Sequence, residues 1–236
     1  ELAQIGQSAE HKYAGVRCGI MDQFASLHGE QGKLIQLDCR SLEHEMIPFA
    51  PADWRIVLID THVKHSLASS EYNQRREQCE AGVKALQKRH THVKSLRDVD
   101  LPMLEESRRE MGETVFSRCR YVVEENIRLL RGVGLLKAGD FTAFGKEMFA
   151  SHAGLRHLYA VSCDELDHLV DTAAQLPGTA GARMMGGGFG GCTINLVSEA
   201  ARETVIARCS ESFEKKFGHK PLVYDVVISD GARRLS

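Results

Sequence analysis

The sequence contains no apolar run that approaches the ~20 residues needed to cross a bilayer, although hydrophobic residues make up 43% of its 236 positions. It also has no strongly basic half, since 30 lysines and arginines stand against 32 aspartates and glutamates, for a formal net charge of −2. Nucleic-acid-binding domains usually carry a basic patch. We therefore expect neither a membrane nor a nucleic acid as partner, and the composition lies in the ordinary range of globular domains.

Closely spaced cysteines are absent as well. The seven cysteines are scattered, their number is odd, and none forms a C-x-x-C pair. Zinc sites and disulfide frameworks favour tighter spacing, so we expect free, mostly buried thiols and a protein of the reducing cytoplasm. Two histidine pairs lack a third ligand at metal-binding spacing and are expected in loops or on the surface: His62 with His65, and His90 with His92.

Apolar residues at three- and four-residue spacing predict a helix that is already under way at the first residue. Leu2, Ile5, Ala9 and Tyr13 lie on one face of it, and Gly15 ends it. Such a start, with no cap before it, predicts a chain truncated at its N-terminus. The length allows one large domain or two small ones.

The rest of the chain predicts a mixture of helices and strands. An apolar run at 54–59 is typical of a central strand, and a long helix is expected at 69–88. The regular β-α-β alternation of a parallel sheet is missing, which indicates an α+β fold. Further strands are predicted at 33–37, 45–49, 183–185, 193–197 and 222–228, with helices around 115–129, 141–148, 166–173 and 206–217.

The strongest local signal is a glycine-rich loop at 186–191, formed by Gly186, Gly187, Gly188, Gly190 and Gly191 around one phenylalanine. It satisfies G-x-G-x-x-G, but a dinucleotide-binding fold needs a helix after the loop, and a strand is predicted there. A protein kinase would also need its lysine, H-R-D and D-F-G motifs, which are missing. The loop amides can form an anion-binding concavity, and a tight hairpin without a ligand is the alternative.

Two further segments combine polar residues with a predicted helix start. Asp22, in the string 18–24 (CGIMDQF), is either a catalytic base or a helix N-cap, and its spacing alone favours the cap. The stretch 66–76 (SLASSEYNQRR) follows the buried strand, where sites are common. A capped helix with a solvated charged face explains the same residues equally well.

These segments together resemble the galactokinase family of the GHMP superfamily. The similar strings are 18–24, 38–43 (DCRSLE), 66–79, 162–167 (SCDELD) and 183–192, in the family's order, and the likeness extends from Glu10 to Gly231. The resemblance implies the GHMP kinase fold. Residues 1–65 would be the end of a ribosomal-S5-like N-terminal domain, and residues 66–236 a ferredoxin-like C-terminal domain.

The resemblance also implies roles for single residues. Asp22 matches the base that takes the proton of the C1 hydroxyl of α-D-galactose, and Tyr72 and Gly19 match residues that contact the sugar. Glu10 matches a glutamate assigned to Mg²⁺. The glycine-rich loop matches the motif beside the phosphates of ATP, the expected co-substrate. Asp22 and Tyr72 are expected to face one cavity.

The chain departs from the family at Met185, where the family usually has threonine, and at 155–159, which is less acidic. The family's N-terminal sugar segment with its arginine, and the Gly/Ser-rich loop that cradles ATP, are expected outside these residues. We therefore expect the isolated chain to be inactive, with an open sheet edge around 54–59. A kinase of another sugar, such as N-acetylgalactosamine, and a regulator that senses galactose and ATP remain alternatives, although retention of Asp22 favours catalysis.

Overall fold

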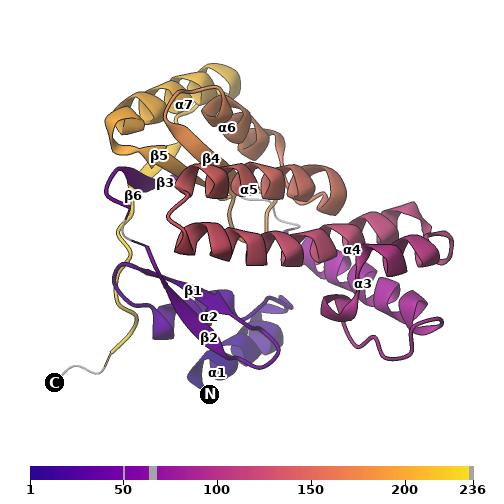
Figure 1. Cartoon of the computed structure of the whole chain (residues 1–236). Coiled ribbons are helices and arrows are strands. Elements are labelled where there is room, and N and C mark those ends of the chain that lie inside the picture. Colours follow the sequence, from indigo (N-terminus) through magenta and orange to yellow (C-terminus); the bar gives the residue numbers. More distant parts are fainter. Residues whose placement is uncertain (50, 64–67, 234–236) are drawn as a thin grey trace.

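The computed structural model describes residues 1–49, 51–63 and 68–233, and only the backbone of residues 68–70 (Figure 1). It opens with α1 (Leu2–Ala9), which continues as a π-helix (Glu10–Ala14) and ends at Gly15 in the left-handed region, with φ 69°. The predicted first helix and its glycine stop are thus confirmed. A loop leads to α2 (Met21–His28).

A two-stranded antiparallel hairpin follows, formed by β1 (Lys33–Leu37) and β2 (His44–Pro48). Both strands were predicted, but the predicted range of the second strand, 45–49, starts one residue after the observed one. Ile35 lies opposite Met46 in the register. All five residues of β1 are only half-buried, whereas Ile47 of β2 is 1% exposed and packs with residues of later helices and strands.

A second sheet has four strands in the order β4-β5-β3-β6, and every neighbouring pair is antiparallel. The strands are β3 (Trp54–Asp60), β4 (Thr179–Met184), β5 (Cys192–Ser198) and β6 (Leu222–Asp225). The expectation of an open edge around 54–59 is wrong for 57–59, which pair with β5 and β6, whereas 54–56 pair only with β5 among the described residues. The central position predicted for β3 is confirmed, while β6 ends three residues earlier than predicted.

Five longer helices complete the described part of the chain: α3 (Ala68–Gln87), α4 (Leu101–Lys137), α5 (Phe141–Gly154), α6 (Asp164–Ala174) and α7 (Arg202–Phe217). In α4, Asp100 caps the first turn by accepting a hydrogen bond from the amide of Met103. Gly112 breaks the helix, with φ 72° and ψ 160°. Shorter turns are the 3-10 helices Leu96–Asp98 and Glu199–Ala201 and the π-helix Leu155–Tyr159.

The four-stranded sheet is covered on both faces (Figure 1). On one face Val57 and Ile59 pack with residues of α6 and α7, including Leu169 and Phe213, all at most 1% exposed. On the other face Leu196 packs with residues of α4 and α5. Alternate residues of the strands therefore serve two cores, which is the α+β architecture that the sequence predicts.

The order of elements from β3 onward is strand, helices, a β4–β5 hairpin, α7 and strand, which is the β-α-β-β-α-β pattern of ferredoxin-like folds. In this pattern β3 is the first strand of the C-terminal unit, yet it precedes the boundary predicted between residues 65 and 66. That boundary stays a prediction. We propose a division between β2 and β3 in its place, because β3 shares its sheet with β4, β5 and β6.

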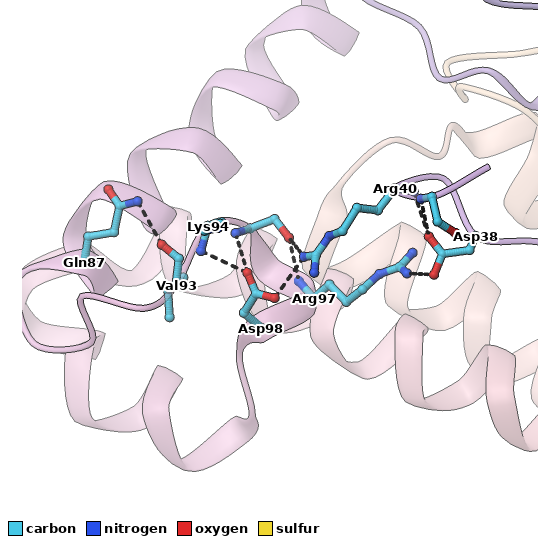
Figure 2. Close-up of polar contacts among 9 residues, drawn as sticks. Asp38, Arg40, Gln87, Val93, Lys94, Arg97 and Asp98 are labelled. Atoms are coloured by element: carbon cyan, nitrogen blue, oxygen red, sulfur yellow. Dashed lines mark hydrogen bonds and ion pairs between the residues drawn. The ribbon is translucent and has the colours of Figure 1, made fainter. Parts of the chain in front are cut away.

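Charged side chains join the β1–β2 turn to the connection between α3 and α4 (Figure 2). Asp38 pairs with Arg97, and Arg40 pairs with Asp98 at 2.9 Å. Asp98 also accepts hydrogen bonds from the amides of Lys94 and Ser95. These amides and Arg40 lower the pKa of Asp98 to about 2, so this carboxylate remains charged at all but strongly acidic pH.

The burial of the seven cysteines differs from what the sequence predicts. All seven cysteines are free, as predicted, but only Cys119 and Cys209 are buried and Cys39 is exposed, so the expectation of mostly buried thiols is wrong. Burial raises the pKa of Cys209 to about 11.

Within the described residues, none of the helices has the length and apolar character that crossing a bilayer demands.

Candidate active site

The glycine-rich loop is the turn between β4 and β5, where the amide of Met185 donates to the carbonyl of Cys192 at 2.9 Å. A strand follows the loop, so the dinucleotide-binding alternative is excluded by the structure. At two positions of the loop only glycine fits. A Cβ atom on Gly188 would lie 2.1 Å from the carbonyl oxygen of Val161, and one on Gly190 would lie 2.3 Å from that of Val63. Both also have positive φ.

Some of the amides of this loop are open to a ligand, whereas the amide of Phe189 is not. The amide of Phe189 donates to the carbonyl of Val161 at 2.7 Å. The amides of the five loop glycines donate to no acceptor among the described residues, and Gly186 and Gly187 are exposed. Successive free amides in a tight turn favour an anion. The loop therefore fits the phosphate-side role that the resemblance assigns to it.

Tyr72 packs against this loop. A Cβ atom on Gly187 would lie 3.3 Å from the ring of Tyr72, so the loop backbone and the aromatic ring are in direct contact. Tyr72 lies in the first turns of α3 and is half-buried. The structure thus brings together two predicted site segments that are far apart in the sequence. Ser66, the first residue of the quoted stretch, lies outside the described residues.

The segment that precedes α2 is tied to the same helix. Asn73 accepts a hydrogen bond from the amide of Arg17 (3.0 Å) and donates to the carbonyl of Gly15 (3.1 Å). Arg76 donates to the carbonyl of Arg17 at 3.0 Å. Arg17 also pairs with Glu80 at 2.5 Å, and hydrogen bonding from Arg17 lowers the pKa of that carboxyl. These contacts fix the loop before Asp22 relative to α3.

Asp22 is the second residue of α2 and is exposed. The N-cap interpretation is wrong, because the helix begins at Met21, two residues earlier than a cap at Asp22 requires. Ile20 holds the cap position and its carbonyl accepts the hydrogen bond of Phe24. The carboxylate of Asp22 makes no hydrogen bond or ion pair with the described residues. Gly19, also exposed, has no atom within 4 Å of a built Cβ position, so packing does not require glycine there.

Glu10 is exposed at the start of the first π-helix. Its neighbours Gln7 and His11 both contact the carbonyl of Cys18, at 3.2 and 2.9 Å, so this helix supports the loop that leads to Asp22. No cluster of three or more His, Cys, Asp or Glu side chains within the described part of the chain forms a metal site. A magnesium ion bound to a nucleotide needs only one or two carboxylates, so Glu10 remains compatible with its implied role.

The predicted histidine pairs contribute no ligand set. His62 and His92 are exposed, and His90 lies 3.4 Å from Glu106. The rings of His90 and His92 have centroids 6.3 Å apart. The expectation of loop or surface histidines is confirmed for these three, and His65 lies outside the described residues.

A cavity of about 460 Å³ lies between the β1–β2 hairpin and α4, α5 and β5. Met21, Met185 and Gly186 line it at the site end, so the residue before Asp22 and the start of the glycine-rich loop share this space. Asp22 and Tyr72 themselves do not line it. The expectation that these two side chains face one cavity therefore stays a prediction.

A charged network forms one wall of this cavity. Glu125 accepts a hydrogen bond from Ser151 at 2.5 Å and pairs with Arg128. Arg183 lies 3.7 Å from Glu125, and Arg128 lies 3.7 Å from Glu147. Arg183 sits in β4 just before the glycine-rich loop, so the network connects that loop to α4 and α5. Spacing of three residues between Glu125 and Arg128 was visible in the sequence, but nothing there indicated that both face a cavity.

Sequence reasoning also missed Arg17, Asn73 and Arg75 as supports of the site. Asn73 and Arg75 lie within the stretch quoted for the resemblance, and a helical face drawn through Tyr72, Arg75 and Arg76 would have placed Arg75 beside Tyr72. Arg17 gave no signal of its own.

The family and the relatives can now be compared with this geometry. The sequence profile described as GHMP kinases C terminal matches residues 133–215, which include α5, α6 and the glycine-rich loop. The galactokinase of Thermotoga maritima is 43% identical over 235 residues, 100% of this chain and 65% of that protein. The galactokinase of Homo sapiens is 43% identical over 233 residues, 99% of this chain and 57% of that protein.

Residues 133–215 thus match the C-terminal part of GHMP kinases, and the whole chain is similar to galactokinases. It spans about 60% of the length of the curated relatives it matches. The structure of Lactococcus lactis galactokinase in complex with galactose superimposes with a TM-score of 0.93 at 36% identity, over 99% of this chain and 60% of that one. A homoserine kinase from Cytophaga hutchinsonii, with a TM-score of 0.58 and 15% identity, shares the fold. The predicted GHMP fold is confirmed.

Proposed function

We propose that the complete protein carrying this chain is a galactokinase that transfers the γ-phosphoryl group of ATP to the C1 hydroxyl of α-D-galactose. The observation that supports this most is the likeness over the whole chain to galactokinases, including one solved with galactose, at a TM-score of 0.93. The contact between Tyr72 and the glycine-rich loop adds support, because it joins the implied sugar side and the implied phosphate side of one site.

Within this proposal Asp22 is the base. Its carboxylate is exposed, lies in the first turn of α2 and makes no bond with the described residues, so it is free to accept a proton from a sugar hydroxyl. Gly19, three residues earlier, leaves open space in which a sugar hydroxyl approaches the backbone. Tyr72 offers an aromatic face and a hydroxyl.

The nucleotide side rests on the free amides of the glycine-rich loop, which suit phosphate oxygens. Glu10 is the carboxylate that would hold Mg²⁺, and that ion, when bound, neutralises charge on the phosphates of ATP. The residues of this chain orient the acceptor and accept its proton. They hold the acceptor and donor in place, which is the main requirement of phosphoryl transfer.

The test is Asp22→Asn in the complete protein, with formation of ADP from MgATP and galactose followed in a coupled assay. Loss of the base predicts a turnover lower by about 100-fold or more. Asp164→Asn, in the first turn of α6 and also exposed, is the matched control and keeps its activity. Near-normal turnover of Asp22→Asn would remove the base from the proposal.

The same assay separates the competing functions. Faster turnover of N-acetylgalactosamine than of galactose would show a kinase of the other sugar. Binding of galactose and MgATP in calorimetry without any ADP formation would show a sensor. The free thiols support a cytoplasmic location, which fractionation of cells can test.

We further propose that the isolated 236-residue chain has no kinase activity. It spans about 60% of its relatives, and its loop amides alone surround too little of a triphosphate to supply the electrostatic stabilisation of the transition state. Calorimetry with MgATP and the coupled assay with galactose test this on the purified chain. Tight binding together with turnover would contradict it.

A further inference from the structure

Arg75 is a buried arginine at the centre of the site, and the proposed chemistry does not use it. Its side chain is 9% exposed. Its Nε donates to the carbonyl of Tyr159 and its Nη2 to that of Ala160, both at 2.9 Å. Nη1 donates to the side chain of Gln74 at 2.7 Å, and Glu71 lies 3.3 Å away. The guanidinium is therefore fully engaged, and its main partners are two successive backbone carbonyls.

The turn that Arg75 binds is conformationally strained. Ala160 ends the π-helix Leu155–Tyr159 in the left-handed region, with φ 53° and ψ 56°. The next residue, Val161, accepts the hydrogen bond from the amide of Phe189, which itself has φ 60°. Left-handed residues other than glycine persist only where their surroundings hold them. One hydrogen bond thus joins Phe189 to the residue that follows Ala160, so the two left-handed residues lie on either side of the same contact.

Arg75 also contacts the glycine-rich loop directly. Its guanidinium lies over the ring of Phe189, 5.7 Å from the ring centroid. Gly188, the residue before Phe189, passes so close to Val161 that no side chain fits between them. One side chain of α3 thus touches the turn just before Val161 through hydrogen bonds and Phe189 of the loop through the aromatic ring.

We infer that Arg75 is a positioning residue that sets the conformation of the glycine-rich loop. It holds the turn at Tyr159 and Ala160, which in turn fixes the amide of Phe189 and the path of the loop. Because Arg75 follows Tyr72 by one helical turn, the same helix fixes the sugar-side aromatic and the phosphate-side amides relative to one another. A lysine cannot replace it, since an ammonium lacks the planar fork that reaches two carbonyls while stacking on a ring. The catalytic part of this inference rests on the proposed function.

The experiment compares Arg75→Lys and Arg75→Ala with the unchanged complete protein. Arg89→Lys is the matched control, because Arg89 follows the far end of α3 and pairs with Glu110 on the surface. Hydrogen exchange of the Phe189 amide, which donates to Val161, is followed by mass spectrometry of the peptide covering 186–191, together with kcat, KM for both substrates and the melting temperature. For Arg75→Lys we expect exchange in that peptide at least about tenfold faster and kcat about tenfold lower, with a melting temperature within a few degrees of the unchanged protein.

Arg75→Ala adds a chemical test. Guanidinium at millimolar concentration, below the range that unfolds proteins, should restore part of its kcat, whereas ammonium should not. Unchanged exchange at 186–191 in both variants would overturn the inference, as would a loss of kcat that only follows the loss of folded protein. If the unchanged protein does not phosphorylate galactose, the proposed function fails. The exchange measurement still decides whether Arg75 positions the loop.

Discussion

The residues before β3 and the unit that begins with β3 differ in how they close their cores. In the later unit the sheet has helices on both faces, and Val57, Ile59 and Phe213 are at most 1% exposed. In the earlier region the strands of a two-stranded hairpin are mostly half-buried or exposed. Leu2, Ile5, Tyr13 and Met21 are each more than half exposed there.

The two regions therefore have different roles: one provides the stable core, and the other carries most of the candidate site residues. The later unit supplies the rigid scaffold, including the glycine-rich loop on its β4–β5 turn. The earlier region carries Glu10, Gly19 and Asp22 on short helices and loops, held to the scaffold by a few polar contacts such as those of Asn73 and Arg17. Sites are often built this way, with functional residues on segments that a rigid scaffold positions.

The largest effect is expected in the core of the later unit. Phe213→Ala removes a fully buried ring between α7 and the sheet, and should lower the free energy of unfolding by about 3–5 kcal/mol. Leu34→Ala in β1 removes a half-buried side chain and should lower it by about 1 kcal/mol. Urea unfolding of the complete protein measures both. Equal losses of unfolding free energy in the two variants would contradict the difference between the regions, and would mean that other residues of the complete protein cover the hairpin.

A pair of glycines sharpens the comparison at the level of the backbone. Gly188→Ala places a Cβ at positive φ against the carbonyl of Val161, and we expect a loss of about 1–3 kcal/mol together with loss of activity. Gly19→Ala meets no atom within 4 Å and should change the free energy of unfolding by less than about 0.5 kcal/mol. Thermal unfolding measures both. A Gly188→Ala protein as stable as the unchanged one would contradict the close contact.

The ion pairs of Figure 2 join the two regions, and their effect on stability should be smaller than that of Phe213→Ala. Asp38 and Arg97 are both about 40% exposed, so water screens their attraction. A double-mutant cycle with Asp38→Asn and Arg97→Gln measures the coupling in urea unfolding. A coupling as large as the effect of Phe213→Ala would show that the contact, and not the apolar core, holds the regions together.

The smallest expected effect is on the stability of the protein at acidic pH, through Asp98. Asp98 has a folded pKa of about 2 against an ordinary value of 3.8, owing to the amides of Lys94 and Ser95 and to Arg40. A depressed pKa stabilises the folded state above pH 3.8, and this stability is lost as the pH falls toward 2. Asp98→Asn should therefore be less stable at neutral pH and should flatten the fall in stability across this window. Melting temperatures at pH 5, 4, 3 and 2 measure it, and identical acid profiles of the two proteins would contradict the assignment.

The sequence was sufficient where one physical preference dominated. The apolar run of β3, the glycine stop at Gly15 and the strand after the glycine-rich loop all follow from local pattern, and all are confirmed. The cap interpretation of Asp22 failed because the helix starts two residues earlier, and local propensity does not fix a helix start to within two residues. Contacts such as those of Arg75 with Tyr159 join positions far apart in the chain, and no local pattern contains that information.

The strand order has a consequence for how the chain is made. β3 is synthesised long before its neighbours, since Val57 pairs with Asn195 and Asp225. The α3–α4 pair is close in sequence and can form during translation, whereas β3 has no strand beside it until β5 and β6 have been synthesised. Strand pairing over such sequence distances is slow, and it leaves an apolar, unpaired strand that can aggregate with other nascent chains. The glycine-rich loop, which depends on β4 and β5 being in place, therefore takes its shape late in folding.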